Sequence, residues 1–185
     1  SRCDAPKCAF ERRPTPPGVV QRRRPKATDY GLRLREKQKV KHYYGVLERQ
    51  FRTYFARAER GKGNTGESLM SLLERRLDNV VHRLGFAPSR SAARQLVMHG
   101  HLTVNGRRLD VPSYLVRAGD TLRVKNRAKS LQLAHAALAD ARREVPDFLS
   151  RVDGGIPEGR VNRLPVADDV SLPVQANLII ELCSK

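Results

Sequence analysis

The stretch SRSAARQLVMHGHLTVNGRRLDVPSYLVRAGDTLRVK, residues 89–125, carries the signals for a helix followed by a hairpin and a further strand. Ser89 can cap the helix, apolar residues recur at helical spacing over 92–97, and Gly100 can end it. The dipeptide Asn105-Gly106 then predicts a two-residue turn, since a type I′ turn requires positive φ at both central positions. Arginines on the helix and directly after the turn suit this stretch to contact phosphate groups.

The charge of the whole chain favours a polyanionic partner. Its 185 residues carry a formal net charge of +17 and a pI near 10.7, and self-repulsion of that size opposes compaction unless a polyanion neutralises it. No apolar run approaches the length of a membrane helix and no signal peptide is visible, so we expect no membrane partner. Three cysteines without a disulfide framework favour a reducing cytoplasm.

The positive charge is concentrated toward the N-terminus. Residues 1–62 hold 18 Lys and Arg against 6 Asp and Glu, residues 63–130 hold 12 against 5, and residues 131–185 hold 6 against 8. We therefore expect the first two-thirds of the chain to face the polyanion, and the last third to face protein or solvent.

Residues 1–28 are rich in proline and arginine and show no hydrophobic periodicity. They cannot bury enough apolar surface to fold alone, so they form either a disordered basic tail or an extended arm that orders along RNA. Cys3 and Cys8 in this segment resemble half of a structural zinc site, which needs four ligands. The pair is either two ordinary thiols or, with an upstream Cys pair, a zinc site.

Hydrophobic periodicity predicts three more helices, over residues 47–60, 65–84 and 129–144. A cap at Thr28 or Asp29 predicts another over 29–42, with basic residues around most of its circumference. The helix over 65–84 has the longest apolar face, which suits a helix that joins two halves of a molecule. Tyr30, Tyr43 and Tyr44 could stack on bases or pack against a neighbouring helix. Short segments near 148–152 and 161–164 could add a second hairpin, and residues 174–182 fit a helix or a strand.

Motifs for a known family run along nearly the whole chain. They are RRPTPPG at 12–18, DYGLRLREKQKVKHYYG at 29–45, ERQF at 48–51, LERRLDNVVHRLGFA at 73–87, SRSAARQLVMHGHLTVNGRR at 89–108, VPSYLVRAGD at 111–120 and the ending IIELCSK. With these motifs the chain resembles the family of bacterial small-subunit ribosomal proteins numbered four. It departs from the family at Val19-Val20-Gln21, where members often have Gln-His-Gly, and in lacking the upstream Cys-x-x-Cys of metal-bearing members.

The resemblance implies an α+β fold. The implied fold has an extended basic N-terminal arm and a helical domain. An inserted domain, the alpha-L RNA-binding motif, consists of an antiparallel sheet packed by helices. In this sequence the arm would cover 1–28, the helical domain 29–70 plus 157–185, and the inserted domain 71–156, with its core motif at 89–125.

The resemblance also implies a structural constituent of the small ribosomal subunit and not an enzyme. Family members bind 16S ribosomal RNA, nucleate assembly of its 5′ domain and contribute to translational accuracy. Implied partners are that 5′ domain and neighbouring small-subunit proteins, notably number five and also number three, and some members bind their own operon mRNA. We expect no membrane contact, no homo-oligomer, and no required cofactor apart from a structural zinc if an upstream Cys pair exists. The expected location is the ribosome, in the cytoplasm.

Carried over to matching positions, the resemblance implies RNA contacts in both domains. In the arm and the helical domain these are Arg12, Arg13, Arg22, Arg23, Arg24, Arg33, Arg35, Lys37, Lys39, Arg49 and Arg52. In the inserted domain they are Arg76, Ser89, Arg90, Arg94, Gln95, His99, Asn105, Arg107, Arg108, Ser113 and Tyr114. The candidate metal ligands are Cys3 and Cys8.

Two other functions compete with this interpretation. RNA-modifying enzymes such as pseudouridine synthases and methyltransferases carry the same RNA-binding domain, but this chain leaves no residues for a catalytic domain. A free regulator that binds nucleic acid, for instance a basic DNA-binding protein, would have the same charge, and competition between RNA and duplex DNA distinguishes it. His99 and His101 fit a metal pair or a phosphate contact, and the phosphate contact is favoured.

Overall fold

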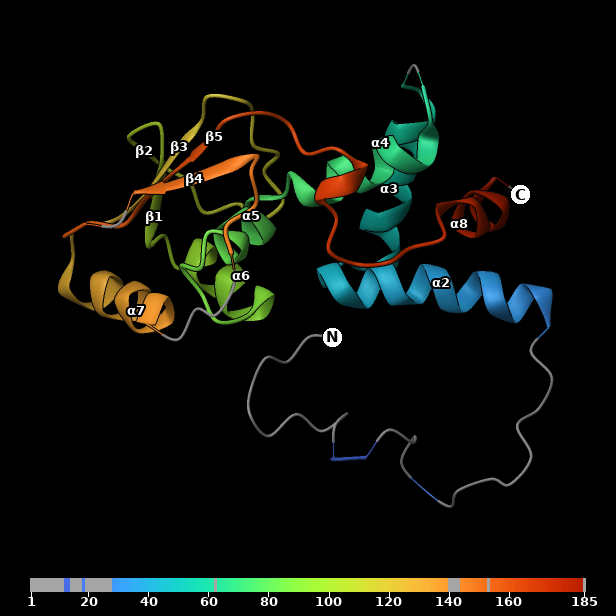
Figure 1. The fold of residues 1–185 in the computed structure, drawn as a ribbon, viewed down its shortest axis with the longest axis horizontal. Coiled ribbons are helices and arrows are strands. Elements are labelled where there is room, and N and C mark those ends of the chain that lie inside the picture. The colour runs from blue at the N-terminus through green and yellow to red at the C-terminus, as the bar shows by residue number, and fades with distance from the viewer. Residues whose placement is uncertain are drawn as a thin grey trace.

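The computed structural model describes residues 12, 13, 18, 28–61, 63–139, 144–152 and 154–184. Nearly all of these residues belong to two bodies that lie side by side along the long axis of the molecule, one made of helices and one of a sheet with helices against it (Figure 1). The predicted α+β class is thereby confirmed. Most of the predicted basic arm, including Cys3 and Cys8, lies outside the described residues.

The helical body consists of α2 (Asp29–Tyr44), α3 (Glu48–Glu59), α4 (Thr65–Glu74) and α8 (Ala176–Cys183). The hydroxyl of Thr28 caps α2 by accepting a hydrogen bond from the N–H of Gly31 at 3.1 Å. Only a narrow strip of α2 is buried, at Lys37, Val40 and Tyr44. The rest of this helix presents mostly charged and polar side chains, although Tyr30 and Leu32 are exposed as well.

The C-terminal segment is helical, which the sequence left open. α8 packs on α2 and α4, and Ile179 at its centre is 1% exposed in a core that also contains Phe51 and Leu73. Burying a side chain of this size stabilises a fold by about 1.5–3 kcal/mol. All the described strands belong to the other body, so the alternating apolar residues of 174–182 meet no sheet edge that they could join.

The sheet body contains a five-stranded antiparallel sheet of order β2-β1-β3-β5-β4. Its strands are β1 (Leu102–Val104), β2 (Arg107–Arg108), β3 (Thr121–Val124), β4 (Leu149–Val152) and β5 (Glu158–Val161). The helices α5 (Leu77–Arg83) and α6 (Arg90–Met98) lie against one face, and α7 (Ala128–Ala139) lies beside them (Figure 1). A single apolar core joins these helices to the sheet, with Val80, Val97 and Leu122 fully buried. No helix in the described part of the chain combines the length and the apolar character needed to cross a membrane.

The predicted hairpin turn is confirmed. Asn105 has φ 50° and Gly106 has φ 77°, the left-handed values that a type I′ turn requires. The amide of Asn105 also joins the turn to the neighbouring strand, because its Nδ2 donates to Asp120 Oδ1 at 2.8 Å and its Oδ1 accepts from the N–H of Thr121 at 2.9 Å. Asn105 therefore has a structural role, whether or not it touches RNA.

The sheet extends beyond residue 156, the predicted end of the inserted domain. β5 lies between β3 and β4, and Val161 is fully buried in the core of the sheet body. The predicted strand at 161–164 is therefore placed too late in the chain. Gly159 lies inside β5, and a Cβ at this position would be 2.5 Å from Leu84 Cδ1. The glycine permits the close approach of α5 to the sheet.

The prediction of one helix over 65–84 is wrong. α4 ends at Glu74 and α5 begins at Leu77, with Arg76 in an extended conformation between them. The loop before β3 pairs with this break: the N–H of Leu77 donates to Tyr114 O at 2.8 Å, and the N–H of Val116 donates to Arg75 O at 2.9 Å. These long-range hydrogen bonds replace helical ones, and the two bodies join at this point.

Candidate nucleic-acid interface

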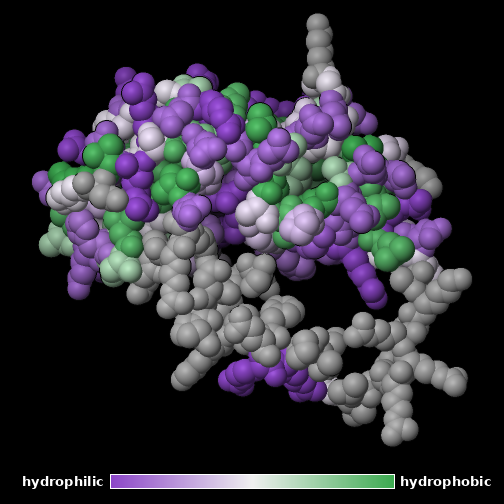
Figure 2. Space-filling view, in the orientation of Figure 1, coloured by the Kyte–Doolittle hydropathy of each residue, from purple (hydrophilic) through white to green (hydrophobic). Residues whose placement is uncertain are grey.

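Two grooves lie between the helical body and the sheet body, and Leu47 lines both of them. The α6 groove, about 1230 Å³, is lined by residues 41–48 and by Ser89, Arg90 and Arg94 among others. The α3 groove, about 760 Å³, is lined by α3 residues from Arg49 to Arg57, by Arg75 and by the loop before β3. Hydrophilic residues cover much of the visible surface, with hydrophobic ones scattered among them (Figure 2).

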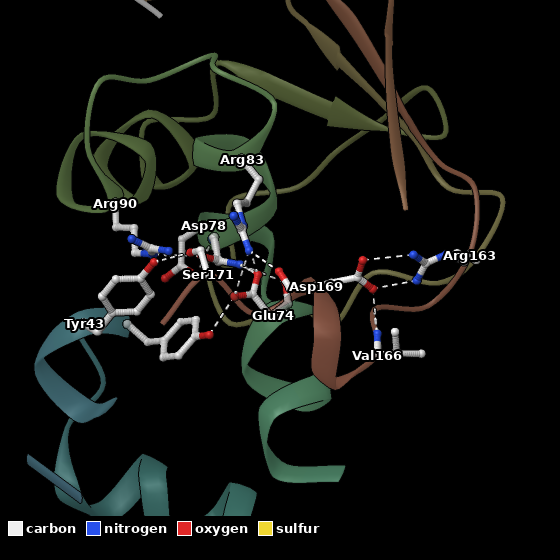
Figure 3. A network of polar contacts seen from close by, with 11 residues as sticks. Tyr43, Glu74, Asp78, Arg83, Arg90, Arg163, Val166, Asp169 and Ser171 are labelled. Carbon is white, nitrogen blue, oxygen red and sulfur yellow. Dashed lines mark hydrogen bonds and ion pairs between the residues drawn. The ribbon is translucent and has the colours of Figure 1, made fainter. Parts of the chain in front are cut away.

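The cations of the α6 groove have partners within the protein. Lys41 Nζ lies 2.6 Å from Glu48 Oε2. Arg90 Nε donates to Asn79 Oδ1 at 2.8 Å, and the guanidinium carbon of Arg90 lies 3.9 Å from the centroid of the Tyr43 ring (Figure 3). Carboxylates of Asp78 and Glu144 line this groove too. The α6 groove therefore carries charges of both signs.

A buried carboxylate, Glu74, joins the two bodies. It is fully buried and accepts hydrogen bonds from the Tyr44 hydroxyl of α2 at 2.6 Å and from Asn79 Nδ2 of α5 at 2.6 Å. Arg83 of α5 lies 3.3 Å from the same carboxylate and also donates to the carbonyl of Asp169 in η1 (Ala167–Asp169) at 2.5 Å (Figure 3). Burial, followed by the charge of Glu74, raises the pKa of Tyr44 well above its ordinary value. We call these five residues the Glu74 network.

The segment that returns from the sheet to α8 is held against both bodies. Arg163 donates to both carboxylate oxygens of Asp169, at 2.6 and 2.9 Å, and lowers the pKa of Asp169. Further along, the hydroxyls of Tyr43 and Ser171 lie 2.6 Å apart (Figure 3). Together with the Glu74 network, these contacts set the orientation of the groove walls before any ligand binds.

Arg76, predicted as an RNA contact, is buried instead. Its side chain is 1% exposed, its Nε and Nη2 donate to the two oxygens of Asp78 at 3.0 and 2.5 Å, and its Nη1 donates to the Tyr54 hydroxyl at 2.9 Å. The guanidinium is buried because the break between α4 and α5 turns the side chain inward. In this fold it is not available to RNA, and its contacts are structural.

Lys37 is the second predicted contact that the fold makes unavailable. It is 9% exposed, and its Nζ donates to Glu48 Oε1 at 2.8 Å. Hydrogen bonds from Lys37 and Lys41 lower the pKa of Glu48 to about 2. Arg33 is half-buried and pairs with Glu181 at 2.7 Å, so part of its donor capacity is also used within the protein.

His82 is buried beside two arginines and therefore resists protonation. It is 6% exposed, and burial, followed by the charges of Arg90 and Arg83, lowers the pKa of His82 to about 3. Between pH 6.5 and 3, the imidazole of His82 is therefore neutral in the folded state. In the unfolded chain, where its pKa is near 6.5, it binds a proton over this range. The stability contributed by the neutral form is present above pH 6.5 and falls as the pH drops from there toward 3.

Lowering the pH from 7 to 5 is expected to cost about 2 kcal/mol of unfolding free energy through His82. Two carboxylates with lowered pKa, Glu48 and Asp169, titrate mostly below this window. Urea denaturation at both pH values checks the effect, and His82→Gln should remove most of it. His101→Gln is the comparison, because the pKa of His101 is also lowered, mainly by burial and by His99. Equal pH dependence in the wild type and His82→Gln would contradict the assignment.

The cations of the α3 groove differ from those of the α6 groove. Arg49, Arg57 and Arg117 make no ion pair with any of the described residues, and no Asp or Glu lines the groove. Arg75 Nε donates to the carbonyl of Val116 at 3.1 Å. Burial, followed by the charges of Arg57 and Arg117, lowers the pKa of Arg75, and the charge of Asp120 opposes this shift. The four arginines line the same groove.

A further cationic surface surrounds the hairpin. Arg107 and Arg108 on β2, two of the predicted RNA contacts, are exposed. Burial, followed by the charges of Arg108 and Arg127, lowers the pKa of Lys125, which places these three cations close together. The rings of His99 and His101 lie 6.2 Å apart between centroids, and within the described residues no group of three His, Cys, Asp or Glu could hold a metal ion.

The remaining predicted contacts are distributed over several surfaces. Exposed ones are Arg12, Arg13, Arg35, Lys39, Arg49, Arg52, Arg94, Gln95, His99, Asn105, Arg107 and Arg108. Half-buried ones are Ser89, Arg90, Ser113 and Tyr114; Arg22, Arg23 and Arg24 lie outside the described residues. Ser89 caps α6 by accepting from the N–H of Ala92 at 3.1 Å. Arg57, Arg75 and Arg117 were not predicted, although Arg57 lies off the apolar face of its helix, which was an available signal.

Comparisons with known proteins cover the entire chain. The family profile described as "Ribosomal protein S4/S9 N-terminal domain" matches residues 1–74, and the profile "S4 domain" matches residues 75–122. The two profiles meet at the break between α4 and α5. The proteins named "Small ribosomal subunit protein uS4" from Trichlorobacter lovleyi and Thermodesulfovibrio yellowstonii are 54% and 53% identical to this chain. Both alignments cover 100% of this chain, and 88% and 89% of the respective relative.

Proposed function

The chain belongs to the uS4 family of small ribosomal subunit proteins and is a structural constituent of that subunit, and we propose that it binds 16S ribosomal RNA there. The observation that carries the proposal is the likeness over the whole chain, which includes both bodies and the break that joins them. The structure supports it with exposed arginines on both bodies, held in one relative orientation by the Glu74 network.

The proposed RNA target is the 5′ domain of 16S RNA, bound early so that the protein nucleates assembly of this domain. Side chains cannot read the deep major groove of A-form RNA, so recognition of a folded junction relies on backbone and shape. Two bodies in a set orientation suit this mode, because both can contact the RNA only when two of its segments meet at a matching angle. As further proposals, neighbouring small-subunit proteins and the protein's own operon mRNA are partners, and translational accuracy depends on this protein. Cys3 and Cys8 bind a structural zinc if a Cys pair upstream of them supplies the other two ligands.

We expect a transcript of the 16S 5′ domain to bind more than about tenfold more tightly than duplex DNA of equal charge at moderate salt. If binding depends on charge alone, the RNA and the duplex DNA have similar affinities and similar salt dependence. If the protein surface is complementary to the folded RNA, non-ionic contacts add affinity for the RNA that depends less on salt. Fluorescence anisotropy over a salt series measures both quantities. Equal competition by the duplex DNA would leave only a general binder of nucleic acid and would refute the specific proposal.

A further inference from the structure

We propose that the α3 groove is a second RNA-binding site, which holds the phosphate backbone of one ribosomal RNA segment separately from the surface around α6. The inference rests on the proposed function and adds a specific location to it. The predicted RNA contacts did not indicate this groove, because only three of them, Arg49, Ser113 and Tyr114, line it.

All the charged side chains that line the α3 groove are positive. Arg49 and Arg57 of α3 line one side of the α3 groove, Arg75 lines it at the break between the bodies, and Arg117 lines it from the loop before β3, without any carboxylate among the lining residues. The α6 groove, in contrast, includes Glu48, Asp78 and Glu144. Asp120, outside the lining, offsets part of the charge of Arg75. The guanidinium groups of the α3 groove still repel one another, and a bound polyanion relieves that repulsion.

The side chains that α3 contributes to the groove form a row along the helix. Arg49, Thr53 and Arg57 recur every four residues, so they lie on one side of the helix, and the two arginines are about 12 Å apart along its axis. A row of that length suits successive phosphates of one strand better than a single anion. Guanidinium groups also match phosphate in geometry, since their planar donors can bind two oxygens at once.

The loop before β3 adds hydroxyl groups to the lining of the α3 groove. The hydroxyls of Ser113 and Tyr114 make no hydrogen bond with the described residues, and both side chains are half-buried at the groove. Ser113 can donate to a phosphate or to a 2′-hydroxyl, and the ring of Tyr114 offers a surface for a base. These groups favour RNA over an acidic peptide, which needs neither a base platform nor a partner for a ribose.

The test replaces Arg49, Arg57 and Arg117 with glutamine in the full-length protein. The matched control replaces Arg60, Arg123 and Arg160, three exposed arginines that line neither groove, so both variants lose three charges. Binding to the 16S 5′-domain transcript is measured over a salt series. We expect the groove variant to bind at least about tenfold more weakly than the control and to reduce the log–log salt slope by about 2 more than the control does, since each phosphate contact contributes roughly 0.7–0.9.

A variant with lysine at the same three positions should recover most of the salt slope, because it keeps the charges. Urea denaturation of each variant shows whether the fold is intact. If the groove and control variants lose equal affinity, or if the groove variant keeps the wild-type slope, the α3 groove is no phosphate site. Loss of binding to a neighbouring subunit protein with unchanged RNA binding would also overturn the inference. In all these outcomes the preference of the wild type for RNA over duplex DNA can persist, so the proposed function is tested separately.

Discussion

Replacing Arg76 with methionine is expected to lower the free energy of unfolding by about 3–5 kcal/mol, because it leaves the buried carboxylate of Asp78 without its charged partner. The side chain of Arg76 is 1% exposed and that of Asp78 is 5% exposed, and two hydrogen bonds join them. The substitution also removes the donor to the Tyr54 hydroxyl. Methionine roughly fills the volume of the arginine stem, so the loss reports mainly on charge and hydrogen bonding.

Urea denaturation at pH 7 measures this loss, and Arg94→Met is the matched control. Arg94 approaches the same carboxylate only to 4.0 Å and its side chain is 44% exposed, so we expect a change below about 1 kcal/mol. Adding Asp78→Asn to Arg76→Met should restore part of the stability, since the neutral amide has a smaller desolvation cost. A loss below about 1 kcal/mol for Arg76→Met would show that the buried pair contributes nothing net.

Replacing Glu74 with alanine is expected to cost about 3 kcal/mol and to weaken the junction between the two bodies. The Tyr44 hydroxyl, the Asn79 amide and Arg83 would all lose their shared acceptor while remaining buried or half-buried. Tyr44 belongs to the helical body, whereas Asn79 and Arg83 belong to the sheet body. We therefore expect unfolding to lose its single cooperative transition, with the two bodies melting at different temperatures.

Differential scanning calorimetry can resolve this effect. The matched control is Glu67→Ala in the same helix, where the exposed Glu67 only accepts from Asn64 at 3.1 Å, and we expect a change of at most about 0.5 kcal/mol. A single unshifted transition in Glu74→Ala would mean that apolar contacts alone hold the bodies together.

Much of the fold could be predicted from local signals. The helix after Ser89, the turn at Asn105-Gly106 and the helix capped by Thr28 each follow from caps and backbone preferences that act within a few residues. The break at Arg76 could not be predicted in this way. It depends on hydrogen bonds to residues 114–116, some forty positions away, and the apolar pattern of 65–84 continues through it undisturbed.

In the candidate interface, too, some residues could be predicted from local signals and others could not. Exposed arginines near the turn, such as Arg107 and Arg108, could be predicted because short polar strands leave their side chains in solvent. Lys37 was misplaced because the mixed-charge sequence of α2 does not show which narrow strip packs on a neighbour. The α3 groove was missed because Arg57 and Arg117 are far apart in sequence and meet only in the folded chain.

The sequence by itself determined the α+β class, the caps, the hairpin, the family and the excess of positive charge, because these follow from local chemistry and from motifs along the chain. Only the tertiary structure decided that residues 176–183 form a helix, that Arg76 is buried with Asp78, and that Gly159 lies inside a strand. The physical reason is that each of these depends on a partner distant in sequence: the core around Ile179, the carboxylate and tyrosine that enclose Arg76, and Leu84 against the sheet.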